Sequence, residues 1–465
     1  MLTGPIYKSL KIRWPDARVA VLVKPRFAAA LQGHPDVDEI LPFQGIFAAV
    51  RLIRGGGYTH LLDLHGNLRS FLIRTLARVP NTATYRKDAL ARHLFVAWRV
   101  SSASLQRHTV DRYHEALSPW GIPAVKARSV LVMQSAFLGD SLLTLPLLRR
   151  LKEIMPQARM TVLTMAKTAD IFRGTPWVDE VLIDDKRGEH GGLSGPWKIS
   201  AQLRVRNFDL VVIPHRSFRS ALIAKLSGIA RRVGFDSSAG SFLLTDTVPF
   251  SWLMHDLERN LSLTEPLGSA ASIAAGESRY VTPPRMNENF ESLLAGAGTR
   301  LAGVHPGSAG STKRWLPERF AELSRRLAAE GLTPVLVGGP EDAALGERIA
   351  QDCGAVNLVG RTGLEDLKAL MGRLNVFVTN DSGPMHLAAA AGVPVVAIFG
   401  ATTRELGFFP YGPGHRVVEA DLACRPCGLH GARECPEGHF LCMRLITVDQ
   451  VLAACLNALR TGAPA

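Results

Sequence analysis

The sequence contains no apolar run long enough to cross a membrane. The longest, from His386 to Phe399, is interrupted by Gly392 and Pro394 and is shorter than the about 20 residues that a bilayer requires. No continuous apolar segment follows the basic N-terminus, so a secretory signal peptide is not expected. Lysine and arginine form no dense run of the kind found in nucleic-acid-binding arms. These absences argue against a membrane-spanning protein, a secreted protein and a nucleic-acid-binding tail, and we expect a cytoplasmic protein.

The composition is that of an ordinary folded protein. Apolar residues make up 47% and charged residues 20% of the chain, with 42 glycines, which excludes disordered and collagen-like classes. A chain of 465 residues is too long for one hydrophobic core and suggests about three domains. The formal net charge of +13 leaves two interpretations open. One is a solvated basic surface, and the other is an anionic partner such as nucleic acid, an acidic lipid surface or a phosphorylated substrate.

Cysteine is scarce, and most of it is confined to one short segment near the C-terminus. Four of the six cysteines fall between positions 424 and 442, interleaved with two histidines. The cysteines are Cys424, Cys427, Cys435 and Cys442, and the histidines are His430 and His439. In a cytoplasmic chain such spacing favours metal binding or reduced thiols over disulfides. The first pair has the CxxC spacing of a zinc site, but the second pair is more widely spaced than in a zinc ribbon. A structural zinc site and packed reduced thiols both remain open.

The first part of the chain repeats in the part that follows it. A shift of 141 positions aligns Leu10-Lys11 with Leu151-Lys152, and Pro35-x-Val37-Asp38-Glu39 with Pro176-x-Val178-Asp179-Glu180. After a loop in which the register drifts, His65, Arg69, Ser70, His108, Arg112, Pro119 and Gly121 align with His215, Arg219, Ser220, His255, Arg259, Pro266 and Gly268. Shared order and spacing over this length predict a duplicated domain. The repeat is asymmetric, because the partner of Asp140 would precede Met1.

Alternating strand-like and helix-like patterns predict an α/β fold with parallel sheets. Strands are expected at Ser129–Met133, Met160–Met165, Glu180–Ile183, Asp209–Ile213, Leu301–Val304, Thr333–Val337, Val376–Thr379 and Val395–Phe399. Helices are expected at Ser141–Met155, Pro317–Glu330, Leu364–Met371 and Pro384–Ala391. We expect a truncated duplicate at 1–125, a second unit at 126–268, a linker at 269–298 and a further α/β domain at 299–465.

Three polar stretches follow expected strands, where ligands bind in open parallel sheets. The first ends in Gly139-Asp140, and its carboxylate suits either a helix N-cap or a general base. The second, His305–Trp315, combines small residues with Lys313, so its backbone N–H groups could cradle phosphates, although it lacks the Walker spacing. A flexible surface loop is the alternative for this stretch. The third, Val376–His386, leads into a helix whose N-terminus suits an anion and sugar hydroxyls.

Taken together, these stretches resemble the bacterial lipopolysaccharide heptosyltransferases, glycosyltransferase family 9. The matching motifs are Leu138-Gly139-Asp140-x-Leu142-Leu143-x-x-Pro146, His305-Pro306-Gly307-Ser308, Lys313-x-Trp315-x-Pro317 and Thr379-Asn380-Asp381-Ser382-Gly383-Pro384-Met385-His386. The cysteine segment, with Cys435-Pro436-x-Gly438-His439, resembles the subgroup that adds the second inner-core heptose. The resemblance covers about Arg128 to the C-terminus, and the first unit resembles the N-terminal half again.

The resemblance implies a GT-B fold of two Rossmann-like lobes facing a cleft, and inverting transfer of heptose from an ADP-heptose donor to the inner core of lipopolysaccharide. Asp140 would be the catalytic base. Donor-binding residues would be Gly307, Ser308, Lys313, Glu341, Asp381, Ser382, Gly383 and His386. Arg216 and Arg219 would bind the anionic acceptor. The chemistry would need no metal, so any zinc held by Cys424, Cys427, Cys435 and Cys442 would be structural.

The resemblance also implies a partner set and leaves alternatives. We expect peripheral contact with the cytoplasmic face of the inner membrane and no nucleic-acid partner. Transfer of another nucleotide-sugar in surface polysaccharide assembly is one alternative, and a non-catalytic basic binding module is another. The first unit, which lacks the Gly-Asp turn, is expected to be catalytically silent. Either it is a docking or acceptor-handling extension, or Met1 marks a misplaced start or a fusion.

Overall fold

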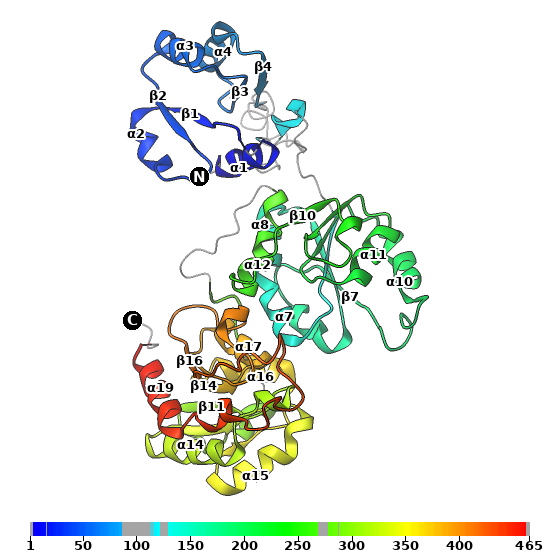
Figure 1. Cartoon of the computed structure of the whole chain (residues 1–465), viewed down its shortest axis with the longest axis vertical. Coiled ribbons are helices and arrows are strands. Elements are labelled where there is room, and N and C mark those ends of the chain that lie inside the picture. Colours follow the sequence, from blue (N-terminus) through cyan, green and yellow to red (C-terminus); the bar gives the residue numbers. More distant parts are fainter. Residues whose placement is uncertain are drawn as a thin grey trace. The chain divides into compact units, whose positions relative to one another are not determined.

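The computed structural model describes residues 3–14, 16–85, 113, 115–120, 129–267, 278–286 and 288–461. The chain divides into two compact units (Figure 1). The first unit comprises 1–128 with 264–270, and the second comprises 129–263 with 271–465. Several sequence expectations lie outside the described residues, namely His108, Arg112, Gly121, the boundary near 125, Gly268 and the linker segment 269–277. Within the described parts, no helix is both long and apolar enough to span a bilayer.

The N-terminal lobe of the second unit, residues 129–263, contains a six-stranded parallel sheet in the order β10-β9-β8-β5-β6-β7. Its strands are β5 Ser129–Met133, β6 Arg159–Thr164, β7 Glu180–Ile183, β8 Leu210–Ile213, β9 Arg231–Phe235 and β10 Asp246–Val248. Its α-helices are α7 Leu138–Leu143, α8 Leu145–Ile154, α9 Ala169–Phe172, α10 Gly195–Arg204, α11 Phe218–Leu226 and α12 Asp256–Ser262. The strand order reverses between β5 and β8, which places a crevice at their carboxyl ends.

The C-terminal lobe, residues 278–461, has the same topology, in the order β13-β12-β11-β14-β15-β16. Its strands are β11 Leu301–His305, β12 Thr333–Leu336, β13 Val356–Asn357, β14 Leu374–Asn380, β15 Val395–Phe399 and β16 Arg416–Glu419. Its α-helices are α13 Glu288–Leu293, α14 Pro317–Ala329, α15 Ala343–Cys353, α16 Leu364–Met371, α17 Gly383–Ala391, α18 Leu441–Arg444 and α19 Val448–Thr461. The expected α/β fold with two Rossmann-like lobes is confirmed.

Both lobes are held by apolar central strands that are covered on two faces. In β5, Val130, Leu131 and Val132 are fully buried, as expected for a strand with helices on both sides. In the C-terminal lobe, Trp315 is buried in the core and donates its indole N–H to the carbonyl of Ile446, 3.0 Å away. This bond fixes the chain just after the polar loop that follows β11, so the loop ends at a rigid point.

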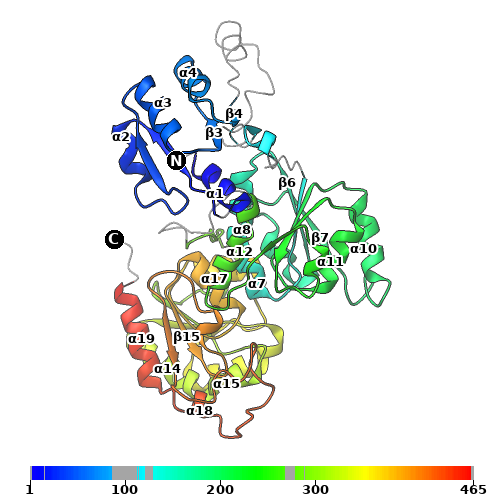
Figure 2. The same ribbon diagram turned by 45° about the horizontal axis from the view of Figure 1, so that its top comes forward.

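The expected helix at Ser141–Met155 is divided in two. Helix α7 begins at Leu138 and α8 begins at Leu145, with Thr144 between them. Pro146 occupies the first turn of α8, where its missing N–H would have been needed to continue α7. The short α7 therefore stands apart from α8, and it lies beside α17 of the C-terminal lobe in both views (Figures 1 and 2).

The described part of the first unit contains two separate two-stranded parallel sheets. One pairs β1 Ala20–Val23 with β2 Glu39–Pro42, and the other pairs β3 His60–Asp63 with β4 Asn81–Thr84. Its α-helices are α1 Gly4–Arg13, α2 Pro25–Ala28, α3 Ile46–Gly55 and α4 Leu68–Ala77. Helices α3 and α4 pack on each other, and their inner faces form one apolar cluster.

Ion pairs of the first unit recur in the second at the spacing of the repeat. Lys11 Nζ lies 2.7 Å from a carboxylate oxygen of Asp38. Lys152 Nζ lies 3.0 Å from a carboxylate oxygen of Asp179, and both members of this pair are 141 positions further along (11 to 152, 38 to 179). In each unit the lysine lies on the helix before one strand and pairs with the aspartate that directly precedes the next strand. The same ion pair therefore occurs twice.

The order of elements differs between the two units at one place. In the second unit β5 lies between β6 and β8 and is hydrogen-bonded to both. By position in the repeat, β1 and β3 correspond to β6 and β8, yet in the described part of the first unit no strand joins them. The described residues of the first unit also contain no counterpart of α7, the helix that carries Asp140.

Candidate functional site

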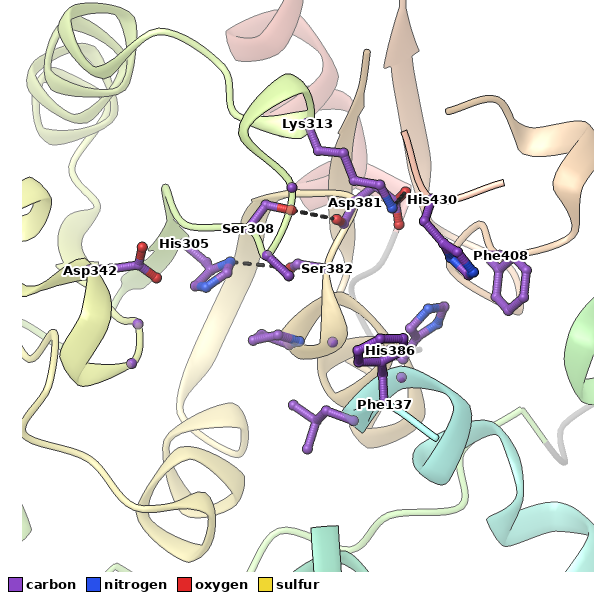
Figure 3. A pocket seen from close by; sticks show the side chains of 18 of the residues that line it. Phe137, His305, Ser308, Lys313, Asp342, Asp381, Ser382, His386, Phe408 and His430 are labelled. Carbon is purple, nitrogen blue, oxygen red and sulfur yellow. Dashed lines mark hydrogen bonds and ion pairs between the residues drawn. The ribbon is translucent and has the colours of Figure 1, made fainter. Parts of the chain in front are cut away.

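A cavity of about 690 Å³ opens between the two lobes of the second unit, a volume typical of small-molecule sites (Figure 3). Loops at the carboxyl ends of strands from both sheets line it. It brings together eight of the residues expected from the sequence, namely Asp140, Ser308, Lys313, Glu341, Asp381, Ser382, Gly383 and His386. Because parallel strands present their carboxyl ends at one edge, loops far apart in the sequence meet here.

Asp140 is the acidic group of the cavity on the N-terminal lobe. It occupies the third position of α7, while Phe137 is the N-cap residue, so an N-cap role for Asp140 is wrong. Its carboxylate accepts a hydrogen bond from the backbone N–H of Phe137, 3.1 Å away. Burial raises the pKa of Asp140, and this effect is opposed by backbone hydrogen bonds and by His430 and Arg259. A carboxylate with a raised pKa in a cleft suits a general base.

The N-termini of α7 and α17 approach each other closely at two glycines. A Cβ on Gly383 would lie 2.6 Å from Leu138 Cδ2 and 3.0 Å from Leu138 Cβ. A Cβ on Gly139 would lie 2.9 Å from His386 Cδ2. Neither position tolerates a side chain without displacing its neighbour, so these glycines set the distance between the base and the C-terminal lobe.

Replacing Gly383 with alanine is therefore expected to push α7 and α17 apart. Overpacking of this kind typically costs about 1–3 kcal/mol, and we expect a lower melting temperature and a fall of at least about tenfold in turnover. Calorimetry and initial rates measure the two effects. Gly55→Ala is the matched control, because nothing lies within 4 Å of its added Cβ. Unchanged stability and turnover in Gly383→Ala would contradict the close approach.

Lys313 and Asp381 form an ion pair at the wall of the cavity. Lys313 Nζ lies 2.7 Å from Asp381 Oδ2, which also accepts a hydrogen bond from Thr402 Oγ1 at 2.7 Å. Ser308 Oγ donates to the backbone carbonyl of Asp381, 3.2 Å away (Figure 3). The pair joins the loop after β11 to the loop after β14. Asp381 is thus the fixed partner of the lysine in this state.

Two buried histidines in the cavity are neutral at physiological pH. Burial lowers the pKa of both His305 and His386 to about 4. His305 Nδ1 lies 3.1 Å from Thr379 Oγ1 and 3.2 Å from Ser382 Oγ. Nδ1 of His386 has no hydrogen-bond partner among the described residues. Neutral imidazoles offer hydrogen bonds to a ligand without adding charge.

Gly307, expected to bind the donor, does not line the cavity. A Cβ at this position would lie 2.0 Å from a carboxylate oxygen of Asp342, so the glycine lets the loop pass close to that side chain. Asp342 itself lines the cavity, and burial raises its pKa. Arg314, which the sequence reasoning missed, also lines the cavity and lies 3.5 Å from Asp342. Gly307 therefore shapes the loop from behind.

The two arginines expected to bind an acceptor have different surroundings, and neither lines the cavity. Arg219 forms a bidentate ion pair with buried Asp184, with Nη2 3.1 Å from Oδ1. Its charge is neutralised within the lobe, where it ties α11 to the residue after β7. Arg216 instead stacks on aromatic rings, 4.3 Å from the Phe250 centroid and 4.7 Å from that of Trp252. Of the two, only Arg216 has no such carboxylate partner in the described structure.

The cysteine segment contributes a cavity residue that the sequence reasoning assigned only to the metal question. His430 lines the cavity, and its ring lies 6.2 Å from that of Phe137. Cys424 Sγ lies 4.0 Å from His439 Nε2, and Cys427 Sγ donates to the Cys424 carbonyl. Among the described residues, no three Cys, His, Asp or Glu side chains are placed to hold a metal ion. Structural zinc stays a prediction.

Comparisons with known proteins agree on one family. A model of glycosyltransferase family 9 (heptosyltransferase) matches residues 196–438. Lipopolysaccharide heptosyltransferase 2 of Salmonella typhimurium is 30% identical over 294 residues, which are 59% of this chain and 84% of the relative. A glycosyl transferase family 9 structure from Veillonella parvula has a TM-score of 0.63 at 24% identity and covers 72% of this chain and 97% of its own. The E. coli ADP-heptose lps heptosyltransferase II structure has a TM-score of 0.58 at 26% identity and covers 71% and 98%.

Proposed function

Because the chain belongs to glycosyltransferase family 9, the heptosyltransferases, we propose that its second unit transfers heptose from ADP-heptose to the inner core of lipopolysaccharide with inversion at the anomeric carbon. The chain is a glycosyltransferase with two Rossmann-like lobes of the GT-B type. The observation that carries the proposal is the meeting of a carboxylate and an anion-binding helix end in one cavity.

The proposed chemistry uses the two walls of the cavity for two tasks. Asp140 takes the proton of an acceptor hydroxyl while the oxygen of that hydroxyl attacks the anomeric carbon of the donor sugar. The bond between the anomeric carbon and the diphosphate breaks in the same step. Helix α17 begins after Ser382, whose side chain makes no capping hydrogen bond, and the positive end of its dipole suits the departing diphosphate. Lys313, on the facing loop, adds a positive charge against the negative charge that develops on this group.

The remaining cavity residues suit the nucleotide and the sugar. Glu341 follows β12 and suits a ribose hydroxyl, since a carboxylate accepts two such hydrogen bonds. Ser308 and neutral His386 suit sugar or phosphate oxygens. Asp381 contributes through the lysine that it pairs with. No metal ion is required by this scheme.

An anionic, membrane-associated acceptor is consistent with the surface of the N-terminal lobe. The chain carries a net charge of +13, and Arg216 sits on an aromatic platform at the carboxyl end of β8. Phe242 and Leu253 of the same lobe are 75% and 95% exposed. We propose that Arg216 binds anionic groups of the acceptor and that the protein contacts the cytoplasmic face of the inner membrane peripherally.

Turnover with ADP-heptose and a truncated lipopolysaccharide acceptor tests the proposal, with mass spectrometry of the product. A gain of one heptose is expected. Turnover only with a different nucleotide-sugar would favour the alternative transferase of surface polysaccharide assembly. Salt-sensitive nucleic-acid binding without affinity for ADP would instead favour a non-catalytic basic module. Elemental analysis of the same preparation tests structural zinc in the segment from Cys424 to Cys442.

We also propose that the first unit is a duplicate of the N-terminal lobe and carries no catalysis. The recurring ion pair of Lys11 with Asp38 and the strand pairs β1–β2 and β3–β4, which match β6–β7 and β8–β9 by position, support the duplication. The cavity is lined by residues of the second unit, which supports a silent first unit. A variant that begins at about Lys126 is expected to retain at least about half of the full chain's turnover. If a folded truncation loses all activity, the first unit is needed for transfer.

A further inference from the structure

Helix α12 packs against α7, whose first turn carries Asp140 and is the catalytic turn of the proposed function. The proposed function itself gives α12 no role. Asn260 Nδ2 donates to the carbonyl of Leu143 in α7 at 3.2 Å and to Asp256 Oδ2 at 3.3 Å. Asn260 is buried, so water does not compete for these bonds. The helix that carries Asp140 is therefore attached from behind to α12.

The same helix is attached to the C-terminal lobe at its other side. The backbone N–H of Asp256 donates to the carbonyl of Gly407 at 2.8 Å, and Arg259 Nη2 donates to the carbonyl of Leu406 at 2.8 Å. Leu406 and Phe408 both line the cavity. Helix α12 thus joins the catalytic turn to a loop of the C-terminal lobe. The two hydrogen bonds to this loop come from Asp256 and Arg259.

Arg259 is a buried cation with few direct partners. Its side chain is only 2% exposed, its Nε lies 3.6 Å from Asp256 Oδ1, and this Nε has no hydrogen-bond partner among the described residues. The guanidinium lies 5.0 Å from the centroid of the Phe250 ring and 5.3 Å from that of Phe408. A buried charge is costly unless opposite charges offset it. Asp256 and Asp140 are the two carboxylates that attract it.

Both carboxylates interact electrostatically with this arginine. Asp256 faces Arg259, Asp140 and Arg216, and burial together with the negative charge of Asp140 raises its pKa to about 7. Asp140 faces Arg259 on α12 and His430 on the cysteine segment, both of which lower its pKa. His386 of α17, which packs on the turn at Gly139, is neutral and adds no charge.

We infer that Asp256 and Arg259 are positioning residues for transfer: through α12 they hold the helix that carries Asp140 and couple it to the cavity loop at 406–409, and Arg259 also offsets the charge of Asp140. The inference rests on the proposed function, in which Asp140 is the base. Arg259 stabilises the charged form of Asp140. Asp256, whose pKa of about 7 is raised by the charged Asp140, still holds its proton while Asp140 titrates. Neither residue lines the cavity, so both act through Asp140.

The acid limb of the pH profile of kcat/KM tests this inference, because it reports the protonation of the base in the free enzyme. Asp256→Asn replaces a carboxyl group that is still protonated where Asp140 titrates, so it should leave the limb at its wild-type pH. Arg259→Gln removes the charge opposite to that of Asp140, so the limb should move to higher pH by about half a unit or more. Arg259→Lys should restore part of this shift. Asp246→Asn is the matched control, since that residue pairs with Arg231 in the same lobe and should leave the limb unchanged.

A purely structural role of Arg259 would lower kcat in Arg259→Gln and leave the acid limb at its wild-type pH, and that result overturns the inference. Thermal unfolding against pH gives a readout that needs no transfer. The folded-state pKa of Asp256, about 7, lies above its unfolded value, so wild type should lose stability relative to Asp256→Asn as pH rises from about 4 to about 7. If wild type does not turn over but this difference appears, the proposed function fails while the charge arrangement stands. If the difference is absent, the inference fails.

Discussion

Replacing Asp140 with asparagine is expected to reduce transfer by at least about 10³-fold while leaving the affinity for ADP unchanged. Asparagine is nearly isosteric and its carbonyl oxygen can accept the hydrogen bond from the Phe137 N–H, so α7 should keep its position. What is lost is the basic oxygen that takes the proton from the acceptor hydroxyl. Initial rates at saturating donor and calorimetric titration with ADP measure the two quantities separately.

The pH dependence of the wild-type protein belongs to the same prediction. An aspartate ordinarily has a pKa of about 3.9. Because burial raises the pKa of Asp140, kcat/KM should begin to fall at a pH above that value as the solution is made more acidic. Asp170→Asn serves as a control, since this residue is exposed on α9 and its carboxylate pairs with neighbouring Arg173. Substantial residual turnover in Asp140→Asn would remove Asp140 from the role of base.

The cavity could be predicted from the sequence because its parts are local. Each polar stretch follows an apolar strand, and parallel strands bring their carboxyl ends to one edge, so Lys313 and Ser382 had to be neighbours once the α/β pattern was recognised. Asp140 follows a strand of the other sheet and joins them because the two lobes face each other across the cavity. The central strands could also be predicted from the sequence, since a strand buried on both faces is a continuous run of apolar residues. The short outer strands β13 and β16 carry no such run and were missed.

What the sequence could not supply are the pairings between distant positions. Arg219 follows a strand and has the expected chemistry for an anionic ligand, but it meets Asp184, 35 residues earlier (219 to 184), which no periodicity indicates. His430 was considered only with the possible zinc site because of its cysteine neighbours, but the segment from Cys424 to Cys442 places it at the wall of the cavity. Asp256 and Arg259 look like ordinary helix surface residues, and only tertiary packing buries them behind the base.

The ion pair of Lys313 with Asp381 leads to the second large prediction. Lys313→Met keeps the length of the side chain and removes the charge that offsets the departing diphosphate, so we expect kcat to fall about 10²- to 10³-fold. Asp381 would keep only its hydrogen bond from Thr402, and its unpaired charge should also weaken ADP binding. Lys313→Arg should recover part of the activity. Rates with ADP-heptose and titration with ADP are the measurements.

A double-mutant cycle with Asp381→Asn separates catalysis from structure. At 2.7 Å the two side chains interact directly, so the two substitutions should be clearly non-additive for ADP affinity. For kcat, however, the double mutant should stay as slow as Lys313→Met, because removing the carboxylate does not restore a cation beside the diphosphate. Lys225→Met, at an exposed position of α11, is the matched control and should leave both quantities unchanged. Full recovery of kcat in the double mutant would mean that Lys313 serves only to neutralise Asp381, and the leaving-group role would then fall to the N-terminus of α17.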